Sequence, residues 1–435
     1  GFGDNDNDIW SYTFNASPNA FPVQYSDGTL SGPSTDSGHN PWNMLVHSGY
    51  REQFWNSAQS LIGLTQDFGK IWEPLEGLTA NIKFSWDAWN TTLQRRSKSP
   101  SFYHARGRDA EGRLMYDDNN NDGEWDPVHT GSESLGYEIG RQGTMTRYLE
   151  GSLNYNRLFG NHRVGALFLY NQKIHTNTQA ADGNAALPYK NQGLAGRVTY
   201  AFRDTYFAEV NMGYNGSENF ARGHRFGFFP AFSLAWNVAE ESFVKNNLKW
   251  MNMFKIRYSH GKVGNDNIGD NNRFPYLYTI ATTGYNSEGK PNYVYNWGFG
   301  DYGKSFIGTH YTQMASNGIT WEVATKDDLG IDLSLFNDKF TATVDYFHEK
   351  RTGIFLTREF LPDITGLESK PKANVGEVKS QGFDGNFALK QKLGEVDMTI
   401  RGNITYSKNE VLEKDEENQV YSYLYQKGYR VDQVK

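Results

Sequence analysis

The sequence contains no cysteine among its 435 residues. A disulfide scaffold and a thiolate metal site are therefore excluded. No run of about 18 consecutive apolar residues occurs either, so a membrane-spanning helix, which needs that length, is excluded. Basic residues are not in excess. The 43 Lys and Arg against 50 Asp and Glu give a net charge of -7, which argues against a nucleic-acid partner.

Catalytic motifs are missing as well. The ten His residues are scattered and form no His-Glu-x-x-His zinc pattern. The Gly-x-Ser-x-Gly turn that presents a nucleophilic serine is also absent from the sequence. No catalytic residue is therefore predicted, and the protein is not expected to be an enzyme.

Aromatic residues are abundant, at 15%, with 27 Tyr, 28 Phe and 11 Trp. Transmembrane β-barrels place such side chains in girdles at the two membrane interfaces. The low mean hydropathy of -0.70 is compatible with a barrel, because only alternate residues of each strand face lipid. An aromatic-rich carbohydrate-binding protein or a β-propeller has a similar composition. Of the 45 Gly, many lie in turn-like contexts such as Asn-Gly and Asp-Gly, which favour tight hairpin turns.

Apolar and polar residues alternate with a period of two along much of the chain, which indicates β-strands with two different faces. The pattern is clear in 206–214, 254–260, 340–346 and 398–407. Segments such as 145–158 suit tilted membrane-spanning strands of about 9–11 residues. Roughly a dozen strands are expected, as in part of a large barrel.

The polar side of these strands carries charged residues in mid-strand positions, where a dry sandwich core would make them costly and a water-filled lumen accommodates them. These residues are Glu209, Lys255, Arg257, Asp345 and Arg401. Pro230 lies within another apolar stretch and predicts a bulge or a strand start, since proline lacks the N–H that a sheet ladder uses.

Long polar loops are expected at 17–56, 95–143 and 282–318. Loops of this length are unusual in compact soluble domains, whereas barrels combine short turns on one side with long loops on the other. No internal repeat beyond the hairpin pattern occurs, which argues against a propeller.

One acidic segment is a candidate calcium site. Asp118, Asn120 and Asp122 stand at alternate positions, followed by Gly123 and Asp126, as in the first half of a calcium-binding loop. The twelfth position is His129, where that loop has a bidentate glutamate. A solvated loop tip is therefore the alternative interpretation, and calcium is the one candidate cofactor.

Aromatic side chains in the expected loops are candidate substrate contacts, because aromatic faces stack on sugar rings and pack against peptides. Interface anchoring, loop packing or contact with a partner protein would explain them equally well. The candidates are Trp42, Tyr103, Tyr293 and Trp297.

Several separate stretches between about residues 187 and 387 resemble SusC/RagA-type TonB-dependent transporters, and they occur in the order seen in that family. They comprise Leu187 to Arg197, Phe207 to Phe220, Arg225 to Ala231, Lys255 to Asp266, Trp321 to Lys326 and Asn374 to Phe383.

The resemblance implies an all-β fold, an antiparallel transmembrane β-barrel of roughly 22 strands with long extracellular loops and a plug in its lumen. It also implies the outer membrane of a Bacteroidetes cell and uptake of glycans or oligopeptides. A SusD-like surface lipoprotein would close the extracellular mouth, and TonB would supply the energy. Residues 1–435 are expected to be part of one barrel domain, with the N-terminal plug, the TonB box and the closing C-terminal strands absent from the chain.

Two other functions remain open at this stage. A secreted β-rich glycan-active enzyme would need a pair of carboxylates across a cleft, and nothing in the sequence places such a pair. A surface receptor or adhesin barrel that does not transport would share the strand pattern. Dependence on detergent separates the barrels from the enzyme, and co-purification of a lipoprotein separates a transporter from an adhesin.

Overall fold

The structure is a computed structural model of the chain. It describes residues 6–17, 19–35, 40–118, 122–180, 186–268, 273–281, 284–285, 291–292, 296–298, 305–307, 310–367, 369–431 and 433.

Strands dominate the structure, and the helices are short. The helices are α1 (Asp6–Asn15), α2 (Pro41–His47) and α3 (Ser242–Asn247), with 3-10 turns η1 (Glu73–Leu75), η2 (Val238–Glu240), η3 (Asp363–Thr365) and η4 (Ser422–Leu424). The long strands are β1 (Gly49–Asp67), β2 (Leu78–Ser97), β5 (Glu138–Phe159), β6 (His162–Asn177), β7 (Tyr189–Phe202), β8 (Tyr206–Ser217), β9 (Phe226–Asn237), β10 (Met251–Asn265), β17 (Glu322–Leu335), β18 (Phe340–Thr357), β19 (Lys372–Leu393) and β20 (Val396–Glu413). The short strands are β3 (Ala105–Arg108), β4 (Leu114–Tyr116), β11 (Thr279–Ala281), β12 (Gly284–Tyr285), β13 (Pro291–Asn292), β14 (Asn296–Gly298), β15 (Ser305–Ile307) and β16 (His310–Gln313).

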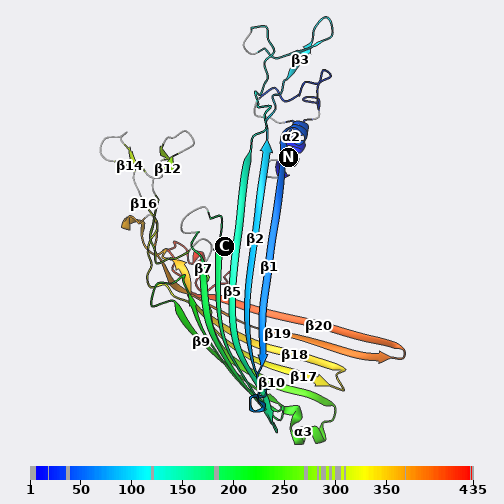
Figure 1. The fold of residues 1–435 in the computed structure, drawn as a ribbon, viewed down its shortest axis with the longest axis vertical. Coiled ribbons are helices and arrows are strands. Elements are labelled where there is room, and N and C mark those ends of the chain that lie inside the picture. The colour runs from blue at the N-terminus through cyan, green and yellow to red at the C-terminus, as the bar shows by residue number, and fades with distance from the viewer. Residues whose placement is uncertain are drawn as a thin grey trace. The chain divides into compact units, whose positions relative to one another are not determined.

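The long strands form a 12-stranded sheet in which each strand pairs with the next long strand along the chain, from β1 to β20. From β6 onward every pairing is antiparallel. Figure 1 shows β7 to β10 in green and β17 to β20 in yellow to orange running side by side. The predicted dozen strands are confirmed. The strands are longer than predicted, because β5 has 22 residues and β20 has 18.

By its contacts the chain divides into two compact units. Unit 1 comprises Gly1–Gln59, Asp87–Met145 and Asn177–Ala186, and it contains α1, α2 and the β3–β4 hairpin. Unit 2 comprises Ser60–Trp86, Thr146–Thr176 and Leu187–Lys435, and it contains β7 to β10 and β17 to β20. The loops predicted at 17–56 and 95–143 are too long, because they include strand residues. β1 begins at Gly49, β2 ends at Ser97, and β5 begins at Glu138. Among the described residues, no helix combines the length and apolar character needed to cross a membrane.

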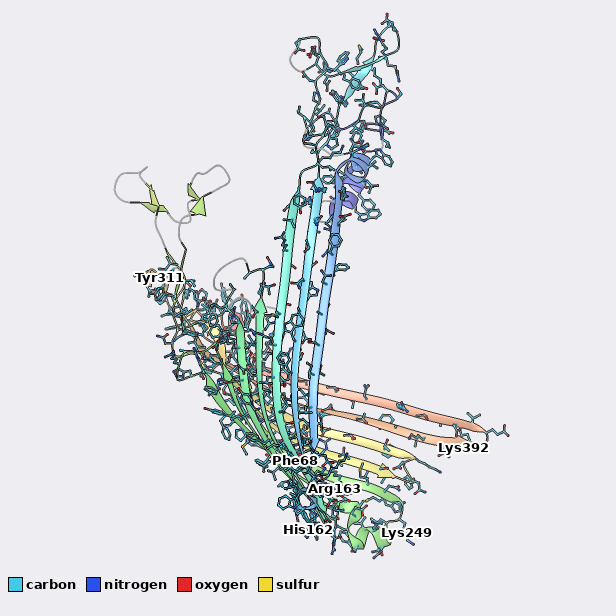
Figure 2. All side chains as sticks on the ribbon, in the orientation of Figure 1. Phe68, His162, Arg163, Lys249, Tyr311 and Lys392 are labelled. Carbon is cyan, nitrogen blue, oxygen red and sulfur yellow. The ribbon has the colours of Figure 1, made fainter. Side chains whose placement is uncertain are left out.

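Short and long connections alternate along most of the sheet; the exception is the β9–β10 connection, 238–250, which is longer than the β8–β9 connection, 218–225. Gly160 and Asn161 alone join β5 to β6, and the β7–β8 turn has positive φ at both Arg203 and Asp204, as a type I′ hairpin requires. By contrast, 266–321 separates β10 from β17. In an antiparallel meander, alternate connections lie at the same end of the sheet. The sheet therefore has a short-turn end and a long-connection end, as predicted for a barrel. In Figure 2, His162 and Lys249 label the short-turn end of unit 2, and Tyr311 labels its opposite end.

The strands of unit 2 have an apolar face and a polar face. On the apolar face, side chains of neighbouring strands lie in register and remain exposed in the chain alone: Val210 is 53% exposed and Val344 is 52% exposed. One cross-strand row of this face, the aromatic row, is rich in rings and consists of Leu234, Tyr258, Leu329, Tyr346, Phe383 and Tyr406. From β10 to β20, the next row toward the long connections is polar and consists of His260, Asp327, His348, Gln381 and Lys408, whereas on β9 and β8 the same row continues with Phe232 and Val210. From β10 to β20 the apolar face therefore ends at a ring-rich boundary, as a lipid-facing belt does.

Pro230 lies inside β9, which begins four residues earlier at Phe226. The prediction that a strand starts or bulges at Pro230 was therefore wrong. The ladder with β8 includes the pair Met212 and Pro230, whereas the ladder with β10 stops one residue away, at Ala231. Proline is tolerated here because the pairing on its other side has ended.

The largest buried apolar group of unit 2 lies at the long-connection end. This loop-end cluster consists of Phe220, Phe229, Ile268, Ile319 and Trp321, with Val323 and Phe355 packed against it. Its members come from one strand and from the segments that connect strands. The cluster therefore holds the long connections against the sheet.

Candidate functional site

An ion network occupies the polar face of β10, β17 and β18. The Arg257 guanidinium donates a 2.8 Å hydrogen bond from Nη2 to Asp345 Oδ2 and a 3.2 Å bond from Nε to Asp332 Oδ2. Its Nη1 lies 3.5 Å from Asp328 Oδ1. One cation thus joins three carboxylates from two strands, and this part of the polar face keeps a net negative charge.

Gly330 makes the network possible. It is the cross-strand partner of both Arg257 and Asp345. A Cβ at this position would lie 2.2 Å from Asp345 Oδ1 and 2.5 Å from Arg257 Cζ. Only glycine leaves room for the guanidinium to reach across β17 to the next strand. This residue has a role that alternation alone does not reveal.

A pocket of about 450 Å³ lies beside the network on the polar face of β7 to β10. Its lining includes Lys255, whose Nζ lies 4.7 Å from the centre of the Phe207 ring, and Glu209, which accepts a 2.6 Å bond from Asn211. Both signs of charge are therefore presented around one concavity. A closed or partly closed sheet with this face inward would offer a hydrated, charged wall to a solute.

Hydrogen bonds tie the connecting segments of unit 2 together at the long-connection end. Asn191 Nδ2 donates a 2.8 Å bond to Asp266 Oδ2, and Asn219 Nδ2 donates a 3.1 Å bond to the Asp266 carbonyl. The Asn374 side chain accepts from Thr320 N at 2.9 Å and donates to the Thr320 carbonyl at 2.9 Å. All of these residues except Thr320 lie in stretches that carry the family resemblance. Three of those stretches, far apart in the sequence, therefore meet at Asp266.

Arg273 is a second tie at this end. Its guanidinium carbon lies 3.5 Å from the centre of the Tyr189 ring, and Nη2 donates a 3.1 Å bond to the Pro188 carbonyl. A 7% exposed arginine that stacks on a ring and binds carbonyls fixes Leu187 and Pro188 to the 273–281 segment. Sequence reasoning missed Arg273, because no periodic pattern marks it.

The calcium candidate is only partly within the described residues, since Asn120 lies outside them. The Asp118 carboxylate accepts backbone N–H bonds from Asp122 at 3.2 Å and from Gly123 at 3.0 Å. Asp126 donates its own N–H to the Asp117 carbonyl at 2.7 Å. Within the described part of the chain, no group of three or more His, Asp or Glu side chains is arranged to hold a metal ion. Calcium binding at this segment stays a prediction.

The four aromatic candidates lie in different surroundings. Trp42 is in α2 and is 42% exposed. The Tyr103 ring packs edge-on against Tyr116 at 5.5 Å, and Tyr103 N donates to the Leu30 carbonyl at 2.9 Å, so Tyr103 is a packing residue of unit 1. Tyr293 lies outside the described residues, and Trp297 belongs to β14. The structure therefore does not bring the four together, and their contact with substrate stays a prediction.

Unit 1 contains a polar pair beside Tyr103. The Tyr116 hydroxyl donates a 2.5 Å hydrogen bond to Asp27 Oδ2. Burial, together with this carboxylate acceptor, raises the pKa of Tyr116 to about 12. The same hydrogen bond, with a second one from the Thr29 backbone N–H, lowers the pKa of Asp27 below its ordinary value.

Residues 298–305 match the spacing Gly-x-x-x-x-Gly-Lys-Ser of phosphate-binding loops. In such loops a helix follows, and its N-terminus holds the phosphate. Here Ser305 begins the strand β15. The match therefore lacks the helix whose N-terminus would bind a phosphate.

No family model matches the chain. Curated proteins do. TonB-dependent receptor P39 of Formosa agariphila is 30% identical over 260 residues, which cover 59% of this chain and 22% of the receptor. TonB-dependent receptor SusC of Bacteroides thetaiotaomicron is 27% identical over 247 residues, which cover 56% of this chain and 22% of SusC. The predicted resemblance to SusC/RagA-type TonB-dependent transporters is confirmed.

Solved structures agree on the fold. The RagAB peptide importer in its closed-closed state superposes with a TM-score of 0.62 at 16% identity, over 95% of this chain and 42% of that one. A second RagAB structure gives a TM-score of 0.60 at 15% identity. The antiparallel β-barrel fold and the outer-membrane location predicted from the sequence are therefore confirmed. The similar proteins are receptors and transporters rather than enzymes. This chain covers well under two thirds of the curated relatives it matches.

Proposed function

We propose that this chain is part of the wall of an outer-membrane importer that takes up glycans or oligopeptides. The apolar face of the sheet contacts the lipid bilayer, and the polar face, with the Arg257 network, lines the lumen. The short-turn end lies in the periplasm and the long-connection end faces outward, because barrels carry short turns inside and long loops outside. Residues 1–435 belong to one barrel domain in this proposal.

The observation that carries the proposal is the apolar face of the sheet, on which exposed side chains of neighbouring strands lie next to one another. Side chains such as Val210, Leu234 and Val344 are each more than half exposed, and they match across neighbouring strands. At roughly 25 cal/mol per Å² of apolar surface, a soluble protein would gain by burying such a face. From β10 to β20 the face ends at the aromatic row, and contact with lipid accounts for both features at once.

The similar proteins support the transport half of the proposal. SusC is named a TonB-dependent receptor, and RagAB is described as a peptide importer. We therefore propose that the complete protein couples to TonB, contains a plug in its lumen, and works with a SusD-like surface lipoprotein at the long-connection end. It performs no chemistry on its cargo. Glycans and oligopeptides both remain substrates in the proposal.

The test is uptake by the source bacterium. Deletion of the gene that encodes this chain should abolish growth on at least one oligosaccharide or peptide mixture as the limiting nutrient, and the intact gene should restore it. The complete protein should require detergent for solubility and should co-purify with a lipoprotein.

Each rival leads to a different result. Solubility without detergent, with cleavage of an oligosaccharide, would overturn the importer in favour of an enzyme. A detergent-dependent protein whose deletion changes no nutrient uptake would indicate a surface receptor or adhesin.

A further inference from the structure

A second pocket, of about 610 Å³, lies on the polar face of β18, β19 and β20 at the long-connection end. Its floor is aliphatic and is formed by Ile354, Leu356, Val378 and Val411. Gly376 keeps the floor open, since a Cβ there would lie 2.8 Å from Leu356 Cδ1 and 2.9 Å from Ile354 Cβ. We name this concavity the rim pocket.

One wall of the rim pocket is the segment 414–431, which returns along the end of β20. Gly428 N donates a 2.8 Å bond to the Val411 carbonyl, and Val431 N donates a 3.0 Å bond to Asn409 Oδ1. The Glu416 carboxylate accepts hydrogen bonds from Gln426 N at 2.7 Å and from Lys427 N at 3.1 Å. These bonds hold the wall in place in the absence of a ligand, so the pocket is preformed and binding need not order it.

Charges of both signs surround the aliphatic floor. Arg351 Nη2 lies 3.0 Å from Glu349 Oε1, and Arg351 Nε lies 3.3 Å from Glu322 Oε1. Glu413, Lys414 and Gln426 also line the pocket; Lys414 pairs with Gln426, and Glu413 Oε1 lies 2.6 Å from Lys427 Nζ. The pocket thus presents an apolar centre with guanidinium, ammonium and carboxylate groups at its edge. Such a pattern complements an amphiphilic, zwitterionic ligand.

We infer that the rim pocket is a subsite for an oligopeptide, in which an aliphatic side chain enters the floor and the charged edge pairs with peptide charges. This inference rests on the proposed function. Glycans fit less well, because sugar rings are recognised by stacking on aromatic faces, and no aromatic ring lines the described part of this pocket. The pocket near Lys255 and Glu209 repeats the combination of both charge signs further along the same face.

The experiment uses the complete transporter in detergent with two synthetic probes, the pentapeptides Ala-Ala-Leu-Ala-Ala and Ala-Ala-Ser-Ala-Ala, and a linear glucose oligosaccharide. Dissociation constants are measured by calorimetry. The intact protein should bind the leucine peptide about tenfold or more tightly than the serine peptide, in line with the effect of a few methylene groups in an apolar pocket. The oligosaccharide should bind more weakly than either.

Two variants and one control locate the binding. Val378→Thr keeps the volume but makes the floor polar, and it should remove most of the preference for leucine over serine. Val378→Trp fills the pocket and should abolish leucine-peptide binding. Val344→Trp, the same substitution on the apolar face of β18, should leave both affinities unchanged. Outer-membrane assembly of each variant is checked by its thermal unfolding.

The outcomes distinguish the two proposals. If growth on oligosaccharides depends on the transporter and the peptides do not bind, the rim-pocket inference fails while the importer stands. If the peptides bind but Val378→Thr and Val378→Trp do not alter the preference, the pocket assignment fails. If no nutrient depends on the transporter, the proposed function itself fails.

Discussion

Replacing Arg257 by Gln tests the ion network most sharply. The substitution removes a cation that hydrogen-bonds Asp345 and Asp332 and faces Asp328. A hydrogen bond to a charged group contributes about 1.5–3 kcal/mol net, and the two bonds would sum to about 3–6 kcal/mol. The Arg257 side chain is 34% exposed, so water replaces part of the loss. We expect Arg257→Gln to lower the free energy of unfolding by about 2–4 kcal/mol.

The measurement is urea unfolding of the complete protein in lipid vesicles, followed by intrinsic fluorescence. Arg401→Gln is the matched control, because Arg401 lies exposed on the same face of β20. We expect its effect to be within about 0.5 kcal/mol. Asp345→Asn in the Arg257→Gln background should recover part of the loss, with a coupling energy of about 1–2 kcal/mol. Equal effects of Arg257→Gln and Arg401→Gln would refute the reasoning.

Three further predictions follow from the same geometry. Gly330→Ala should destabilise the protein by about 1–3 kcal/mol in the urea assay, because its Cβ collides with the ion network; an unchanged midpoint would contradict the network. Fluorotyrosine at Tyr116, followed by ¹⁹F NMR, should titrate at clearly higher pH than free fluorotyrosine, because burial and the Asp27 carboxylate raise the pKa of Tyr116. Asp27→Asn should lower that midpoint. The raised pKa of Tyr116 means that its share of stability is complete below pH 10 and is lost as the pH rises through about 12. The lowered pKa of Asp27 means that its contribution to stability is present above pH 3.8 and is lost at more acid pH. If Asp27→Asn leaves the titration midpoint of Tyr116 unchanged, the pairing of the two side chains is refuted. Val344→Lys should cost about 2–4 kcal/mol and Thr343→Lys under about 1 kcal/mol, since only the first places a charge in lipid; similar costs would contradict the face assignment.

The strands and their faces were predictable because alternation is a local property. Residues 206–214 and 340–346 already show which side chains share a face, and the structure confirms that their apolar members match across strands. Strand ends were less predictable. Residues 49–56 read as polar loop because Arg51, Glu52 and Gln53 dominate them, yet β1 includes them. Backbone pairing with a neighbouring strand decides whether these residues form a strand, and the local sequence pattern does not indicate that pairing.

The site was only partly predictable. Arg257 and Asp345 were identified as charged residues on a polar face, but their contact depends on the register between β10, β17 and β18. Gly330 and Arg273 carry no periodic signal, since their roles come from the space and the carbonyl groups that distant segments provide. The register between strands therefore brings together residues that are far apart in the sequence, and this register could not be predicted from the sequence.

The central claim is that the apolar face meets lipid and the polar face meets water. The direct measurement is spin-label accessibility along β18, with single cysteines at 340–348 in the complete protein in vesicles, since this chain brings no cysteine of its own. Collision with oxygen, which concentrates in lipid, should peak at Ala342, Val344 and Tyr346. Collision with a water-soluble nickel chelate should peak at Thr341, Thr343 and Asp345. An absent period of two, or the opposite phase, would contradict the account.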